Sequence, residues 1–304
     1  MFDYTVGMDR ELEHAALVVL LTRPRAPWAA VAAAVEEAGS ALRVLERGLQ
    51  PDGQERLFPS GQSWDEELDE AARKLQAWQA EGLSFVSLLD SGYPTQLLEI
   101  HQRPPFLMSR GGQLDSFGGG VAIVGTRQAS ENGLRQARSL ALGITARQVP
   151  VVSGLAAGID TAALEAATEA GGRPVGVIGT GLHRSYPTQN ARLQDRVAHD
   201  GVVISQFFPD APPTKTSFPM RNAVMSGYAA ATVVVEAAWR SGARMQARLA
   251  LEHGRPVFLM SSLLEHDWAR DYAERPGVTV VKDAEDVLAR LGDVLQPVDE
   301  LTWA

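Results

Sequence analysis

Apolar residues repeat with helical spacing through the first 80 residues of the chain. Two series with apolar positions three or four residues apart are Leu12, Ala16, Val19 and Leu20, and then Val31, Val35, Ala38 and Leu42. A further amphipathic segment runs from Trp64 to Ala80. Such spacing places apolar side chains on one face of a helix, so we expect a helical N-terminal domain over residues 1–82. Its composition indicates a role in packing or in contact with a partner, and none of its residues points to catalysis or ligand chemistry.

From Leu83 onward the pattern changes to short apolar runs separated by helical stretches. The nine runs that predict strands are Phe85–Leu89, Pro105–Met108, Val121–Val124, Pro150–Val152, Pro174–Ile178, Val202–Ile204, Thr232–Val235, Pro256–Met260 and Val278–Val281. The stretches that predict helices are Ser130–Arg147, Ile159–Ala170, Gln189–His199, Arg221–Tyr228 and Ala243–His253. This alternation is typical of an α/β fold with a doubly wound, mostly parallel sheet. We expect one such domain over residues 83–292, followed by an acidic tail over residues 293–304.

Three of the predicted strands run directly into turns that are rich in glycine and hydroxyl groups. In a parallel sheet such turns lie at the carboxyl ends of the strands, where free backbone N–H groups at helix N-termini bind phosphate. The residues that we expect to contact a phosphate-bearing ligand are Gly125, Thr126, Ser153, Gly154, Gly158, Gly179, Thr180 and Gly181. Glycine also permits close packing of strands against helices, and for each turn taken alone both interpretations stay open.

Charge is unevenly distributed along the chain. The formal net charge is −9, yet residues 118–256 carry +5, whereas residues 1–110 carry −7 and residues 257–304 carry −6. A basic centre between acidic flanks is the composition expected around a localised anion site. An ordinary arginine-rich surface would give the same counts.

Several classes of chemistry lack the residues that they need. The chain has no cysteine, which excludes disulfides, a thiol nucleophile and thiolate zinc sites and suits a reducing cytoplasm. The dinucleotide and Walker fingerprints, the G-x-S-x-G elbow and H-E-x-x-H are missing, and the six histidines show no metal-ligand spacing. No apolar run reaches the roughly 18 residues of a membrane span. We therefore expect a cytoplasmic protein that has no cofactor, metal or membrane contact and is not an enzyme.

The glycine turns belong to a longer series of spaced motifs. In chain order these are Tyr93-Pro94, Ala122-Ile123-Val124-Gly125-Thr126-Arg127, Val152-Ser153-Gly154-Leu155-Ala156, Gly158-Ile159-Asp160, Gly179-Thr180-Gly181-Leu182, Tyr186-Pro187, Phe218-Pro219, Arg221-Asn222, Val235-Glu236-Ala237 and Ser241-Gly242. With this order and spacing, the chain resembles the DNA-processing protein A (Smf) family. The resemblance implies a Rossmann-like domain that binds single-stranded DNA, commonly as a homodimer, and loads a RecA-type recombinase in DNA recombination and natural transformation.

The resemblance also implies which residues contact DNA. They are Arg127, Lys215, Phe218, Arg221 and Asn222. The cationic side chains would follow the phosphate backbone, and the flat ring of Phe218 would offer a surface on which a base stacks, worth about 1–3 kcal/mol per base. Taken alone, Phe218 would more often belong to a core, and Lys215 would more often be a solvated surface charge.

Three further motif residues are expected to support the site. Asp160, at the second position of a predicted helix, would complement the helix dipole or cap a neighbouring loop. Asn190 would either cap its own helix or hold a loop. Glu236, at a strand end, would accept hydrogen bonds that fix the Arg221-Asn222 loop or the Ser241-Gly242 turn.

The chain also departs from the family pattern, and a second function stays open. Ala223 stands where members usually carry a further arginine, and only a few acidic residues follow Leu291, where members often have a winged-helix-like domain. The fold is shared with phosphoribohydrolases and with sensors of nucleotide-derived ligands in defence or stress systems, in which Glu236 would act as general acid or base. Their G-G-x-G-T-x-x-E signature is absent, because three valines precede Glu236. The basic centre and the lysine–phenylalanine pair favour DNA, and a scaffold for a partner protein is a third interpretation.

Overall fold

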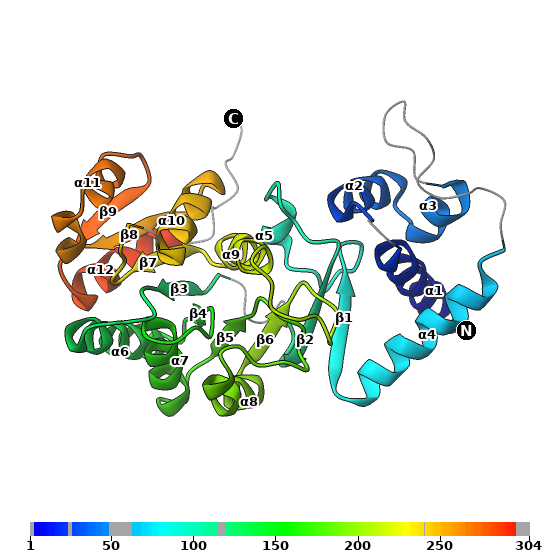
Figure 1. The fold of residues 1–304 in the computed structure, drawn as a ribbon, viewed down its shortest axis with the longest axis horizontal. Coiled ribbons are helices and arrows are strands. Elements are labelled where there is room, and N and C mark those ends of the chain that lie inside the picture. The colour runs from blue at the N-terminus through cyan, green and yellow to red at the C-terminus, as the bar shows by residue number, and fades with distance from the viewer. Residues whose placement is uncertain (1–2, 24–25, 49–62, 115–118, 240, 296–304) are drawn as a thin grey trace.

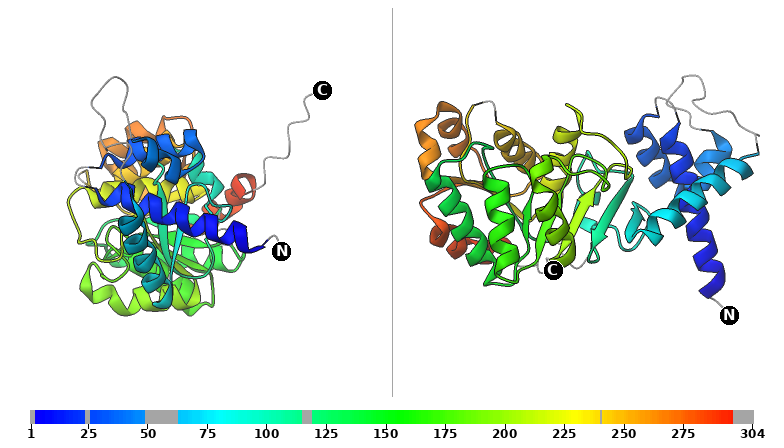
Figure 2. Two further views of the ribbon diagram at one scale, coloured as in Figure 1. Left: turned by 90° about the vertical axis from the view of Figure 1, so that its right-hand side faces the viewer. Right: turned by 60° about the horizontal axis from the view of Figure 1, so that its bottom comes forward.

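Four helices come first in the chain and lie together beyond one end of a large sheet (Figures 1 and 2). The structure, a computed structural model, describes residues 3–23, 26–48, 63–114, 119–239 and 241–295. The helices are α1 (Asp3–Thr22), α2 (Trp28–Ala38), α3 (Ala41–Arg47) and α4 (Asp65–Ala80). Most of their apolar side chains point inward, as the spacing predicts, although Leu12 of the first predicted series is 39% exposed. Helix α1 packs against both α3 and α4.

A nine-stranded sheet forms the framework of the remaining chain. Its strands are β1 (Leu83–Ser87), β2 (Phe106–Gly111), β3 (Val121–Val124), β4 (Val151–Ser153), β5 (Pro174–Val177), β6 (Val202–Ser205), β7 (Ala231–Val234), β8 (Val257–Met260) and β9 (Val278–Val281). In space their order is β1-β2-β6-β5-β4-β3-β7-β8-β9. All strands from β6 to β9 in this order pair in parallel, whereas β2 is antiparallel to both β1 and β6. The predicted doubly wound, mostly parallel α/β sheet is confirmed.

Helices cover both faces of this sheet. On one face lie α6 (Glu131–Thr145), α7 (Ile159–Glu169) and α8 (Ala191–Asp200), and on the other lie α9 (Ser217–Tyr228) and α10 (Gly242–Glu252) (Figure 1). The remaining elements are α5 (Thr95–Leu98), the 3-10 turns η2 (Thr188–Asn190) and η3 (Ser261–Glu265), α11 (Asp267–Ala273) and α12 (Ala284–Leu295). Within the described ranges, no helix is both long and apolar enough to cross a bilayer.

Helix α9 begins four residues before the predicted start. A reciprocal turn causes this: Ser217 N donates to Thr214 Oγ1 at 3.0 Å, and Thr214 N donates to Ser217 Oγ at 3.1 Å. Pro219 then falls in the first helical turn, where its missing N–H costs no hydrogen bond. Phe218 is therefore held on a helix and does not lie in a loop.

The helices near the C-terminal end were not predicted. The acidic tail was predicted over residues 293–304, but α12 extends into that range as far as Leu295. Val287 and Leu291, earlier in this helix, are buried on one of its faces. Asp286 N donates to Asp283 Oδ1 at 2.9 Å just before this helix, which satisfies one of its free N-terminal amides. Of the predicted tail, residues 296–304 lie outside the described residues.

Aromatic side chains join the helical region to the sheet. Phe106 of β2 is fully buried, and its ring centroid lies 5.0 Å from that of Phe85 and 4.8 Å from that of Phe208. Trp28 of α2 lies 5.5 Å from Phe106, and Trp78 of α4 lies 5.7 Å from Phe208. The four N-terminal helices thus share a core with the sheet, and the domain boundary at residue 82 stays a prediction.

Substitution at the centre of this aromatic cluster should destabilise the whole protein. Phe106→Ala removes the ring that contacts both the helices and the sheet, so we expect the free energy of unfolding to fall by about 3–5 kcal/mol. Leu142→Ala, at a leucine that is 49% exposed on α6, is the control and should change it by less than about 1 kcal/mol. Urea denaturation followed by circular dichroism measures both; a small effect of Phe106→Ala would contradict a shared core.

A buried carboxylate forms a second link between the helical region and the sheet. Arg10 Nε and His14 Nε2 of α1 lie 2.8 and 2.7 Å from the carboxylate oxygens of Asp90, and Ser87 N donates to Asp90 Oδ2 at 2.6 Å. Burial raises the pKa of Asp90, but the hydrogen bond and charge of His14, the Ser87 amide and the charge of Arg10 together lower it to about 2.

This link predicts a defined acid dependence of stability. Because the pKa of Asp90 is lower in the folded protein than its ordinary value, the carboxylate stabilises the fold above about pH 4, and the contribution disappears as the pH falls toward 2. Asp90→Asn should lower the free energy of unfolding at pH 6 by about 1–3 kcal/mol, and its difference from wild type should shrink below pH 4. Denaturation curves across this range test it, with the exposed Asp69→Asn as control; a difference that stays constant with pH would be inconsistent with the ion pair.

Candidate nucleic-acid interface

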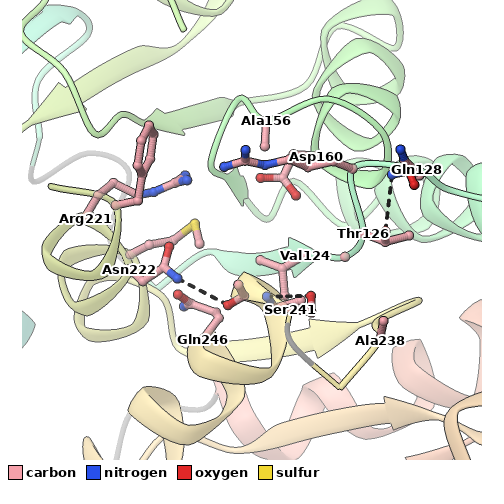
Figure 3. A pocket seen from close by; sticks show the side chains of 16 residues that line it. Val124, Thr126, Gln128, Ala156, Asp160, Arg221, Asn222, Ala238, Ser241 and Gln246 are labelled. Carbon is pink, nitrogen blue, oxygen red and sulfur yellow. Dashed lines mark hydrogen bonds between the residues drawn. The ribbon is translucent and has the colours of Figure 1, made fainter. Parts of the chain in front are cut away.

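The sheet reverses its winding direction at β3. This strand lies between β4 and β7, and the chain leaves β3 toward α6 on one face but leaves β7 toward α10 on the other. Adjacent turns that diverge in this way open a crevice at the carboxyl edge of the sheet. A crevice of about 440 Å³ lies here, lined by the turns after β3 and β7 and by residues of α7, α9 and α10 (Figure 3).

The carboxylate of Asp160 lies at the base of the crevice. Its side chain is 5% exposed, and Oδ2 accepts a hydrogen bond from Gly154 N at 3.0 Å. Burial raises the pKa of Asp160, whereas the charge of Arg221 and the backbone N–H groups of Ala156, Gly154 and Gly125 act in the opposite direction, and the net shift is upward. The first two glycine turns therefore do form an anion-binding nest, but a side chain of the protein occupies it.

Arg221 is the cation that faces this carboxylate. It lies in α9, is 5% exposed, and Nη1 donates to the carbonyl oxygen of Val177 at 2.9 Å. Burial lowers the pKa of Arg221, Asp160 raises it, and the like charge of Arg127 lowers it. A side chain at Gly154 would collide with this guanidinium, because a Cβ there would lie 1.5 Å from Nη1. Glycine at this position therefore permits the approach of Arg221 to the nest.

Arg127 and Phe218 line the crevice together with Arg221 but are more exposed than it. We call these two residues the exposed cluster. The guanidinium carbon of Arg127 lies 5.6 Å from the centroid of the Phe218 ring, and Arg127 is exposed while Phe218 is half-buried. In the described part of the chain, no carboxylate lies within ion-pair distance of Arg127. The Phe218 ring sits close over Gly179, where a Cβ would lie 2.9 Å from a ring carbon. The cluster thus combines a flat apolar surface with an unneutralised cation.

At least three of the eight glycine-turn amides are not free for a ligand, which corrects the prediction made for them. Thr126 N donates to the carbonyl oxygen of Glu236 at 2.7 Å, and Gly181 N donates to that of Ala211 at 2.9 Å. Gly154 N is taken by Asp160. These N–H groups already have partners inside the protein, so a phosphate would have to be bound mainly by side chains.

The remaining members of these turns serve packing. Ser153 is fully buried and its Oγ donates to the carbonyl oxygen of Ile123 at 2.6 Å, while Thr180 Oγ1 donates to that of Arg184 at 3.4 Å. The glycines that let neighbouring chain segments approach closely are Gly125, against Ile159, and Gly158, against the carbonyl oxygen of Thr126. Close packing, the second interpretation of the glycines, accounts for these two glycines, whereas Ser153 and Thr180 bind backbone carbonyl oxygens of the protein.

Asn190 and Glu236, which were expected to support the site, do hold loops. The partners of Glu236 differ from the predicted ones. Asn190 Nδ2 donates to the Leu155 carbonyl oxygen at 2.9 Å and to Thr161 Oγ1 at 2.8 Å, so it holds the turn after β4. Glu236 accepts from Ser130 N at 3.1 Å and from Ser130 Oγ at 2.9 Å. The predicted partners of Glu236 were wrong: its carboxylate fixes the start of α6.

Two of the predicted DNA contacts lie apart from the exposed cluster. Asn222 is buried and its Nδ2 donates to the Gly242 carbonyl oxygen at 3.3 Å, so it holds the start of α10. Lys215 is exposed in the turn just before α9 and does not line the crevice. Among the residues that the structure describes, no three histidine or acidic side chains gather closely enough to hold a metal ion.

Sequence reasoning missed Tyr186 as a site residue. Its side chain is 43% exposed, and its ring centroid lies 5.3 Å from that of Phe218. Tyr186 belongs to the Tyr186-Pro187 motif, which could have marked it as a site residue. Nothing in the sequence predicted a contact between its ring and that of Phe218, because the two residues are distant along the chain. Together they present an extended aromatic surface beside Arg127.

Comparison with known proteins now decides the family. The family model of DNA recombination-mediator protein A matches residues 84–292. The chain belongs to this family. The DNA processing protein DprA of Streptococcus pneumoniae is 39% identical over 207 residues, which cover 67% of this chain and 72% of that protein. The DprA of Bacillus subtilis is 33% identical over 222 residues, covering 72% and 75%. The resemblance that the spaced motifs indicated is confirmed.

Solved structures of DNA processing protein A share the fold. The X-ray structure from Streptococcus pneumoniae is 30% identical with a TM-score of 0.67, and the match covers 95% of this chain and 98% of that one. A structure from Helicobacter pylori, at 24% identity and a TM-score of 0.63, covers 70% of this chain and 97% of that one. The first of these matches extends over the N-terminal helices as well as the sheet.

In this member of the DNA recombination-mediator protein A family, Arg221 should contribute to the stability of the fold. Arg221→Ala removes the cation whose charge favours the ionised form of the buried Asp160, so we expect the free energy of unfolding to fall by about 3–5 kcal/mol. Arg127→Ala removes an exposed guanidinium from the same cluster and should change it by about 0.5 kcal/mol or less. Urea denaturation of both variants provides the comparison; equal effects would argue against a buried Asp160–Arg221 couple.

Proposed function

We propose that this protein binds single-stranded DNA, without sequence preference, at the crevice where the sheet reverses. The observation that carries the proposal is the exposed guanidinium of Arg127 over the half-buried ring of Phe218, at 5.6 Å. Binding of single strands without sequence preference needs cations along the phosphate backbone and aromatic faces for the bases. Tyr186 adds a second ring, 5.3 Å from Phe218.

Charge supports the same proposal. The crevice brings together Arg127 and Arg221, whose mutual repulsion is relieved when an anion binds between them. Lys215, exposed just ahead of α9, would contact a phosphate outside the crevice, next to the start of α9. These side chains belong to the basic segment 118–256, so the acidic net charge of the whole chain does not oppose the assignment.

The relatives add support at the level of the family. The relatives named above are called DNA processing proteins, and the Helicobacter pylori structure is described as showing a single-stranded-DNA binding mode. We extend the proposal to recombination: a homodimer that protects single strands in the cytoplasm and loads a RecA-type recombinase, as in natural transformation, without catalysing a reaction itself. This extension rests on the resemblance to the family.

The competing function, a sensor or hydrolase of a nucleotide-derived ligand, receives less support. It requires Glu236 as a general acid or base, yet this carboxylate accepts two hydrogen bonds from Ser130 at the start of α6. The nest formed by the glycine turns is likewise filled by Asp160. No specific feature of the crevice favours a free nucleotide over a polynucleotide.

The proposal predicts salt-sensitive binding that depends on Arg127. In fluorescence-anisotropy titrations, a short oligothymidylate should bind more tightly than its duplex, and Arg127→Ala should weaken binding and reduce the slope of log K against log salt by about 0.7. Arg135→Ala, at an exposed arginine of α6, is the matched control and should leave the slope unchanged. No binding to either form, together with a nucleotide that raises the melting temperature, would replace this proposal by the sensor.

Phe218 should contribute through its flat face. Phe218→Ala should cost about 1–3 kcal/mol of binding free energy, whereas Phe218→Tyr should retain most of the affinity. Both variants should melt near wild type, because the ring is only half-buried and its neighbours Arg127 and Tyr186 are exposed. A variant that melts early and still binds as wild type would show Phe218 to be a core residue.

A further inference from the structure

Trp239 is an aromatic residue that the proposed cluster does not use. Its side chain is 56% exposed, the largest value among the exposed large apolar side chains of the described residues. Of the other tryptophans that the structure describes, Trp64 and Trp268 are buried, and Trp28 and Trp78 lie in the aromatic cluster between the helices and the sheet. A tryptophan so exposed loses the stabilisation of burial, which makes it a candidate for contact with a ligand.

The ring of Trp239 is held in place without being covered. The guanidinium carbon of Arg244, in the first turn of α10, lies 3.9 Å from the ring centroid, and Arg244 Nη1 donates to the Trp239 carbonyl oxygen at 3.3 Å. One side chain therefore fixes both the backbone and the ring of Trp239. More than half of the tryptophan still faces solvent, so a fixed aromatic surface with an adjacent cation is available before any ligand arrives.

The position of Trp239 relates it to the crevice. It lies in the turn between β7 and α10, and its neighbours Ala238, Ser241 and Gly242 line the same crevice as Phe218 and Arg127 (Figure 3). In that figure Ala238 and Ser241 lie on one side, and Arg221 and Asn222 of α9 approach from another. A chain that passes through the crevice from Phe218 would leave it over the β7–α10 turn.

We propose that Trp239 is a second base-stacking subsite, which binds a nucleobase of the same single strand after it leaves the crevice, with Arg244 beside it to contact the adjoining phosphate. The inference rests on the proposed function and adds the exit direction of the strand. A nucleobase fits because it offers a flat face to a tryptophan, and its phosphate offers an anion to a guanidinium. A preformed ring and cation lower the ordering cost of binding, since neither side chain must be immobilised anew.

The way in which affinity depends on oligonucleotide length distinguishes the Trp239 subsite from the Phe218 surface at the crevice. With a series of oligothymidylates of increasing length, Trp239→Ala should bind the shortest ones like wild type and lose about tenfold in affinity for those long enough to reach both rings. Trp239→Phe should retain most of that affinity. Phe218→Ala should weaken binding at every length.

Tryptophan fluorescence gives an independent readout. A base that stacks on Trp239 should quench emission of the full-length protein when a long oligothymidylate is added, and Trp239→Phe should lose this quenching while still binding in anisotropy. The side chain is exposed, so both Trp239 variants should melt like wild type. Arg244→Ala should weaken long-oligonucleotide binding less than Trp239→Ala, because it removes the support and one phosphate contact but leaves the ring.

The outcomes distinguish the subsite from the function on which it rests. If Trp239→Ala binds like wild type at every length while Arg127→Ala and Phe218→Ala weaken binding, the subsite is wrong and the proposed function stands. If the wild-type protein binds no oligothymidylate, both are wrong. If Trp239→Ala weakens binding equally at all lengths and lowers the mass in light scattering, Trp239 belongs to an interface between subunits, and the subsite is again wrong.

Discussion

A buried carboxylate in a nest of backbone amides organises the carboxyl edge of this sheet. Asp160 accepts from Gly154 N at 3.0 Å and lies among the amides of two glycine turns, opposite the guanidinium of Arg221. A carboxylate that is 5% exposed would be costly without these partners. The turns after β3 and β4, the start of α7 and the side chain of Arg221 on α9 thus meet around a single buried carboxyl group.

This internal couple explains why the outer cluster is available to a ligand. The carboxyl group of Asp160 is buried beside Arg221, whereas Arg127 is exposed and has no carboxylate within ion-pair distance in the described part of the chain. Arg221 also anchors α9, whose first turn carries Phe218 over Gly179. The buried side chains of Asp160 and Arg221 position the aromatic surface, and the exposed arginine supplies the positive charge. Loss of the inner couple should therefore disturb binding even though neither group is exposed.

The alternation of apolar runs predicted the fold well, because strands buried on both faces leave continuous apolar segments that few other structures produce. The site was predictable in part: the motifs pointed to Arg127, Phe218 and Arg221, and the structure brings these three together. What the sequence could not reveal was how the polar groups are shared. A glycine turn looks the same whether its amides face a phosphate or, as with Gly154, an aspartate of the next helix. Nor could it reveal that Tyr186 meets Phe218, a contact made between segments that only the folded sheet brings together.

Photocrosslinking tests the central claim most directly, because it reports where a bound strand lies. An oligothymidylate that carries photoreactive bases is bound to the full-length wild-type protein, irradiated, and the crosslinked peptides are identified by mass spectrometry. We expect crosslinks on the aromatic residues at the crevice, Phe218 and Tyr186 above all. Crosslinks confined to the N-terminal helices or to the β9 end of the sheet, with none at the crevice, would contradict the account.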